Sequence, residues 1–80
     1  MSTPPRPPVT PAELEATKLR LRELAADVAR TEEKIATTFD RLIATSGDPD
    51  GHRRRVADEA RRVATVERAR AAGADVPLRE

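Results

Sequence analysis

Five bulky aliphatic residues recur at intervals of seven along the first half of this chain: Leu14, Leu21, Val28, Ile35 and Leu42. Only a helix returns side chains to nearly the same face with this period over so long a stretch. An apolar stripe of that length must be covered by another apolar surface. The stripe therefore predicts a long amphipathic helix that packs against a second helix, another molecule, or both.

The sequence before the stripe carries the signals of a helix start. Thr10 is a good N-cap, Pro11 suits the first helical position, and Glu13 can complete a capping box with Thr10. No proline or glycine follows until Gly47, so a first helix is expected over about residues 11–45.

A turn at residues 46–48 is expected to follow, with Gly47 in the left-handed conformation that ends many helices. Asp48 and Pro49 can open a second helix as its N-cap and first residue, and this helix is expected over about residues 49–72. A connection this short places the two helices side by side and antiparallel.

The predicted domain is a helical hairpin, residues 10–73, between two segments without regular structure. Residues 1–9 hold four prolines, which favour an extended, flexible arm. The two Pro-x-x-Pro spacings of the arm could dock in an aromatic groove, although a solvated leader is the simpler interpretation. Residues 74–80 are expected to form a flexible tail.

The helix lengths predict how far the hairpin covers its own stripe. In the expected register Ile35 lies beside Ala60, and the second helix reaches back only to about Arg22. The apolar residues before that point then lie on an overhang that needs a second chain. The predicted fold class is therefore all-α: a two-helix antiparallel hairpin, similar to a coiled coil, that assembles into a dimeric four-helix bundle.

The predicted interface combines the stripe, its neighbours on the first helix, and the small aliphatic side chains of the second helix. Its residues are Leu14, Leu21, Leu24, Val28, Ile35, Phe39, Leu42, Val56, Ala60, Val63 and Val66. The expected partners are a second copy, with a dimer favoured, or another helical protein. The chain is thus expected to be a non-enzymatic interaction module with a structural, assembly or adaptor role. A helical inhibitor or antitoxin-like protein that folds on its target is a further alternative.

The charge distribution supports a different alternative. The whole chain is nearly neutral, with 15 Lys and Arg against 14 Asp and Glu, but residues 51–72 hold seven arginines against three acids. Arginines and free amides at a helix N-terminus can bind phosphate, so a small regulator that binds nucleic-acid backbone is the competing hypothesis. The candidate contacts are Arg53, Arg54, Arg55, Arg61 and Arg62. A solvated face with ion pairs such as Asp58–Arg61 explains these residues without a ligand.

The residue types that metal and catalytic sites require are scarce. The chain has no cysteine and one histidine, His52, with Asp48 and Asp50 nearby. One imidazole and two turn carboxylates fall short of the convergent ligands that a metal or a catalytic triad needs. We therefore expect no enzyme activity, no metal and no cofactor.

Location and origin can be predicted only broadly. The chain contains neither an apolar stretch of membrane-spanning length nor a signal-peptide core, so a cytoplasmic protein without membrane association is expected. Thirteen arginines against two lysines, with abundant alanine and proline, are typical of GC-rich genomes and indicate a bacterial or phage source. The outline resembles the secreted Trp-x-Gly hairpin proteins of Gram-positive export systems. Since the turn from Thr45 to Asp48 holds no tryptophan, this resemblance implies hairpin architecture and no function.

Overall fold

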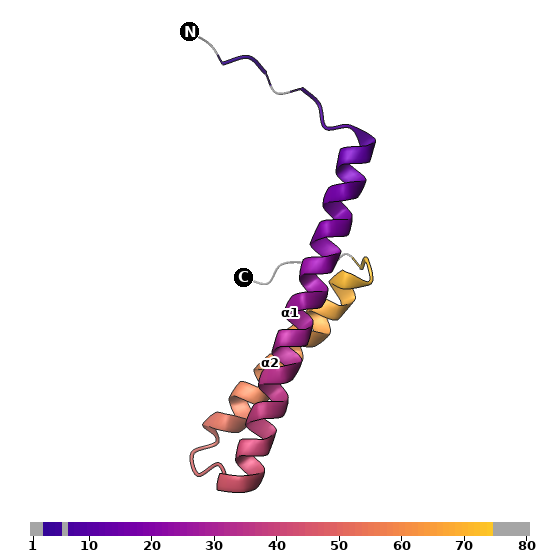
Figure 1. Ribbon diagram of the computed structural model, residues 1–80. Helices are drawn as coiled ribbons and strands as arrows, with labels where there is room; N and C mark the ends of the chain where they lie inside the picture. Colours follow the sequence, from indigo (N-terminus) through magenta and orange to yellow (C-terminus); the bar gives the residue numbers. More distant parts are fainter. Residues whose placement is uncertain (1–2, 6, 75–80) are drawn as a thin grey trace.

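Two α-helices form an antiparallel hairpin in the computed structural model of the chain (Figure 1). The structure describes residues 3–5 and 7–74, so parts of the predicted arm and most of the predicted tail lie outside the described residues. Helix α1 spans Pro11–Ser46 and helix α2 spans His52–Ala71, and no strand occurs in the described ranges. The prediction of an all-helical fold with two helices packed against each other is confirmed.

The start of α1 follows the predicted capping pattern in part. Thr10 has extended backbone angles (φ −74°, ψ 155°), and its Oγ1 accepts a hydrogen bond from the amide of Glu13 at 3.1 Å. Within the described residues, no return bond joins the Glu13 carboxylate to the Thr10 amide, so only half of the capping box forms. At the other end, the amide of Gly47 donates to the carbonyl of Ile43 at 2.8 Å. Gly47 has φ 75° as expected for a glycine, but its ψ of −170° lies outside the left-handed helical region, so the predicted left-handed conformation is wrong.

Helix α2 begins at His52, which is three residues later than the sequence pattern predicts. Gly51, with φ 74° and ψ 4°, is in the left-handed region immediately before the helix, so Asp48 and Pro49 lie in the turn instead of in the first helical turn. The Asp48 carboxylate nevertheless reaches over the turn to amides beyond His52. The prediction of Asp48 as N-cap and Pro49 as first helical residue is therefore wrong, because the N-cap is Gly51, although the Asp48 side chain does supply acceptors to the first turn of α2.

Helix α2 ends in a Schellman motif built on a glycine. Gly73 has a φ of 90°, and its amide donates to the carbonyl of Arg70 at 2.9 Å. The amide of Ala74 donates to the carbonyl of Ala69, also at 2.9 Å. These two bonds satisfy carbonyls that the end of the helix would otherwise leave without donors.

The seam between the helices is built from alanine. The buried apolar residues among those described are Ala25, Ala29 and Ala36 of α1 and Ala57, Ala60 and Ala64 of α2. Because alanine side chains end at Cβ, they let two helix backbones approach closely where larger side chains would hold them apart. Each buried methyl contributes only roughly 0.8 kcal/mol, so this seam stabilises the hairpin weakly.

The first turns of α1 extend past α2. A Cβ placed on Gly73 would lie 3.1 Å from the guanidinium of Arg22, so the end of α2 reaches Arg22, as predicted. The part of α1 before that point runs on without a neighbouring helix (Figure 1). The radius of gyration is 18.8 Å, whereas a compact chain of this length has about 12 Å. The molecule is a rod with an uncovered end.

Candidate protein–protein interface

Apart from Ile35, which is half-buried beside α2, the predicted stripe does not lie in the seam between the two helices. Leu21, Leu24 and Val28 are 59%, 54% and 43% exposed, and Leu14 and Leu42 are exposed as well. The expectation that α2 would cover the stripe between Arg22 and the turn is therefore wrong. The alanines lie on a neighbouring face of α1, and they occupy the seam because close helix approach favours the smallest side chains.

The other predicted interface residues are less exposed than the leucines of the stripe. Ile35 and Phe39 of α1 and Val56, Val63 and Val66 of α2 are partly exposed, whereas Ala60 is buried. Ile35, Val56 and Ala60 line one shallow groove, which confirms the expected proximity of Ile35 and Ala60.

One side of the hairpin carries the stripe of α1 and, next to it, valine side chains of α2 that include Val56. Leu21, Leu24 and Val28 line a shallow groove with Glu67 and Arg70 at the open end of the hairpin. The groove around Ile35 lies on this same side, because Ile35 follows Val28 by one heptad. We call this side, formed by the aliphatic stripe and Leu24 of α1 and by Val56 and Val63 of α2, which are one heptad apart, the apolar face.

Threonines of α1 beside the stripe are less polar than their side chains suggest. The hydroxyl of Thr31 donates to the carbonyl of Asp27 at 3.1 Å, and that of Thr45 donates to the carbonyl of Arg41 at 3.0 Å. A hydroxyl that is satisfied within its own helix leaves the γ-methyl group to contact a partner. The apolar face therefore tolerates these threonines without buried, unpaired hydroxyl groups.

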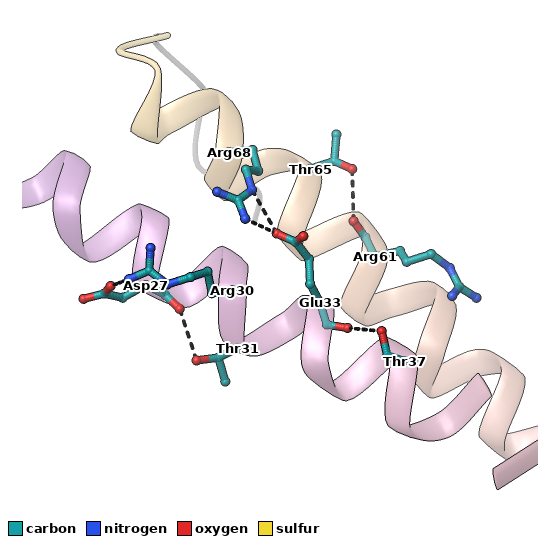
Figure 2. Close-up of polar contacts among 8 residues, drawn as sticks. All are labelled: Asp27, Arg30, Thr31, Glu33, Thr37, Arg61, Thr65 and Arg68. Carbon is teal, nitrogen blue, oxygen red and sulfur yellow. Dashed lines mark hydrogen bonds and ion pairs between the residues drawn. The ribbon is translucent and has the colours of Figure 1, made fainter. Parts of the chain in front are cut away.

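The opposite side of the hairpin is polar and carries two ion pairs between the helices. Arg61 Nη1 lies 2.8 Å from Asp40 Oδ2, and Arg68 Nε donates to Glu33 Oε1 at 2.9 Å. Figure 2 shows Glu33 of α1 reaching Arg68 of α2 across the seam. Such half-exposed pairs contribute at most about 1 kcal/mol each, so their main effect is to leave this side polar and already paired.

The N-terminus of α2 is capped by the turn that precedes it. Asp48 accepts the amides of Arg53 and Arg54, each at 3.0 Å, and the guanidinium of Arg53 donates to the carbonyl of Gly47 at 2.8 Å. The amides that were expected to be free for a phosphate are therefore occupied by a carboxylate of the same chain. An external anion at this helix end would have to displace Asp48.

Two of the remaining candidate arginines are also paired. Arg61 bonds both Asp40 and Asp58, and the hydrogen bond to Asp40 is the main cause that raises the pKa of Arg61. Arg62 bonds Glu59, which raises its pKa in the same way. The expected pairing of Asp58 with Arg61 or Arg62 is confirmed, and the partner is Arg61. Arg54 and Arg55 are exposed.

Asp50 makes the stability of the turn depend on pH. Its carboxylate accepts the amide of His52 at 3.0 Å, and this hydrogen bond holds the pKa of Asp50 below its usual 3.8. Because the pKa is lower in the folded state than in the unfolded state, the stabilisation is present above about pH 3.8 and is lost as the pH falls through the folded pKa. We expect the urea midpoints of the wild type and Asp50→Asn to converge in acid. A difference that stays constant from about pH 7 to pH 2 would count against this linkage.

Other kinds of site find little support in the described part of the chain. No group of three or more His, Cys, Asp or Glu side chains there lies close enough together to hold a metal ion. Neither of the two described helices combines the length and the apolar character needed to cross a lipid bilayer.

The sequence predicts that Ala57, Ala60 and Ala64 of the second helix allow close approach of the helices, and these residues are buried. The α1 half of the alanine seam and the cross-helix ion pairs are features that the sequence interpretation missed. Ala29 and Ala36 recur at an interval of seven, as do Ala57 and Ala64, and this second repeat was available in the sequence. The same interval separates Glu33 from Asp40 on α1 and Arg61 from Arg68 on α2. A heptad repeat of small residues can therefore mark the closest contact between two helices, just as a heptad repeat of large residues can.

No family model, curated protein or solved structure matches this chain.

Proposed function

We propose that this chain is a non-enzymatic helical interaction module with a structural, assembly or adaptor role. The observation that carries the proposal is the apolar face, whose leucines and valines are exposed along most of α1 while the opposite side is polar and paired. Contiguous exposed aliphatic side chains on a small protein are typical of an interaction surface.

The weak seam supports the same proposal. The described core contains only alanine, so the hairpin buries little apolar area of its own. A partner that covers the apolar face supplies the missing burial and stabilises both helices. Folding and association are therefore coupled in this proposal.

The partner that completes the fold most simply is a second copy. Two hairpins that join their apolar faces form a dimeric four-helix bundle, in which each stripe covers the other. Another helical protein with a similar stripe is the alternative partner.

The test compares the wild type with Leu24→Glu by sedimentation equilibrium and circular dichroism. Glutamate is a good helix former, so a loss of association reports burial of Leu24 and not helix propensity. We expect a wild-type dimer and at least a hundredfold weaker dimerisation of the variant, about 1.4 kcal/mol for each factor of ten, because the interface would bury unpaired carboxylates. Thr65→Glu is the control: Thr65 is exposed and lies between Arg61 and Arg68 on the polar side, where a carboxylate is well accommodated.

A wild type that stays monomeric and fully helical at high protein concentration would contradict self-association. Unchanged association of Leu24→Glu would contradict the assignment of the apolar face. A salt titration with duplex DNA and RNA completes the test, since tight binding that weakens steeply with salt would favour the nucleic-acid hypothesis instead.

A further inference from the structure

We propose that two copies pack antiparallel along α1, with the two-fold axis passing between Val28 and Thr31. This inference rests on the proposed function, because it takes the apolar face to be a self-association surface. It adds the direction and the register of the pairing, which determine what covers the overhang of α1.

The overhang is the first argument for the antiparallel direction. The first turns of α1, before Leu21, extend past the end of α2 in the same chain (Figure 1). In an antiparallel dimer, this segment lies along the turn end of the second copy, where α1 and α2 are both present. In a parallel dimer, the two overhangs meet only each other, so Leu14 is covered by one narrow helix instead of two.

The order of side chains along the stripe is the second argument. The row that begins at Leu14 is entirely aliphatic, whereas the neighbouring row, which begins at Thr17 and continues every seven residues, is threonine except for Leu24. A parallel pair places identical residues opposite each other and therefore stacks threonine on threonine in several layers. An antiparallel pair places one row opposite the other, so that every layer contains at least one large aliphatic residue.

In this register each residue of the stripe lies opposite a residue of the threonine row of the second copy. The layers are Leu14 with Thr45, Leu21 with Thr38, Val28 with Thr31, Ile35 with Leu24, and Leu42 with Thr17 of the second copy. These mixed layers differ little in volume, so they fill the interface evenly. The parallel dimer would instead alternate aliphatic layers with threonine layers and leave voids beside the threonines. Because Thr31 and Thr45 bond their hydroxyls to their own helix, their methyl groups can enter such layers.

The charges beside the stripe agree with this register at its centre. Asp27 lies opposite Lys34 of the second copy, and the symmetric pair repeats on the other side of the axis. In a parallel pair Asp27 would lie opposite Glu32 instead. Arg20 and Arg41 flank each other toward the ends of the antiparallel pair, and both are exposed long side chains that can extend into water.

The surface available is sufficient for a stable dimer. The chain exposes 6750 Å², whereas a compact protein of 8.8 kDa exposes about 4800 Å². The excess is about 2000 Å², whereas a standard interface needs about 800 Å² from each partner.

Single cysteines test the direction directly, because the chain has no cysteine of its own. Val28→Cys lies next to the proposed axis, so a short bifunctional maleimide should join two copies of this variant. Two Leu14→Cys side chains lie about 46 Å apart in the antiparallel dimer, so that variant should give no crosslinked dimer alone. A mixture of Leu14→Cys and Leu42→Cys should restore the crosslink. Thr65→Cys, on the polar side, is the control and should give none.

Sedimentation of each variant separates the possible failures. A dimer in which Leu14→Cys crosslinks to itself is parallel and overturns the proposal while the proposed function stands. A dimer in which neither Val28→Cys nor the mixture crosslinks overturns the register in the same way. If every variant and the wild type are monomeric, both the proposed function and this inference are wrong.

Discussion

Replacing Ala29 with leucine is expected to separate the two helices and to lower the free energy of unfolding by about 1–3 kcal/mol. Ala29 is completely buried in the seam, with 0% of its surface exposed, and its neighbours across the seam are on α2. A leucine has no room at this position unless the backbones move apart. Once they move apart, the other alanines of the seam lose their contacts as well, because their side chains are too short to follow.

The effect should be large relative to the total stability. A seam made of alanines contributes little burial, and a loss of this size can unfold a marginal domain. The measurement is urea unfolding followed by circular dichroism at a fixed protein concentration, since association adds to the stability. Ala44→Leu, an exposed position on the same helix, makes the same chemical change and should leave the midpoint nearly unchanged. Equal midpoints for the two variants would contradict the alanine seam.

The helices could be predicted from sequence because their signals are local. The N-cap at Thr10, the absence of proline and glycine through the first helix, and the glycines at its end and at the end of α2 act within a few residues. The overhang was also predictable, because it follows from the two helix lengths. These features need no knowledge of how the helices face each other.

Which face of α1 packs against α2 could not be predicted from these local signals. The sequence shows two heptad patterns on adjacent faces of α1, one of large aliphatic residues and one that includes Ala29 and Ala36. Transfer free energy favours burying the larger residues, and this reasoning led to the wrong face. The hairpin instead buries the small residues, because they allow the two helices to pack closely, and leaves the large ones on the apolar face.

This choice of face connects the fold to the proposed function. Had the stripe been buried against α2, the hairpin would have had a core of its own and a polar exterior. Instead, the alanine seam lets the helix backbones approach closely and leaves the larger aliphatic side chains exposed, where the proposed partner would cover them. The ion pairs between Asp40 and Arg61 and between Glu33 and Arg68 lie on the other side of the hairpin and keep that side polar where the two helices are adjacent.

The second large effect is expected at the turn, where Asp48→Ala should lower the free energy of unfolding by about 1–2 kcal/mol. The Asp48 carboxylate accepts the amides of Arg53 and Arg54, so the substitution leaves two amides at the start of α2 without their acceptor. It also removes a negative charge from a helix end where consecutive arginines already oppose the helix dipole. We therefore expect the first turn of α2 to fray.

Amide hydrogen exchange should locate this effect, because the amides of Arg53 and Arg54 should exchange much faster in Asp48→Ala while those in the middle of α2 change less. Asp58→Ala is the matched control: Asp58 bonds Arg61 on the exposed surface, and such pairs contribute at most about 0.5 kcal/mol. Asp48→Asn should lie between the wild type and Asp48→Ala, since an amide oxygen can accept one of the two bonds without the charge. If Asp48→Ala and Asp58→Ala unfold at the same urea concentration, the Asp48 carboxylate does not stabilise the start of α2. In that case an external anion, bound by the neighbouring arginines, becomes the better explanation of why arginines gather at this helix end.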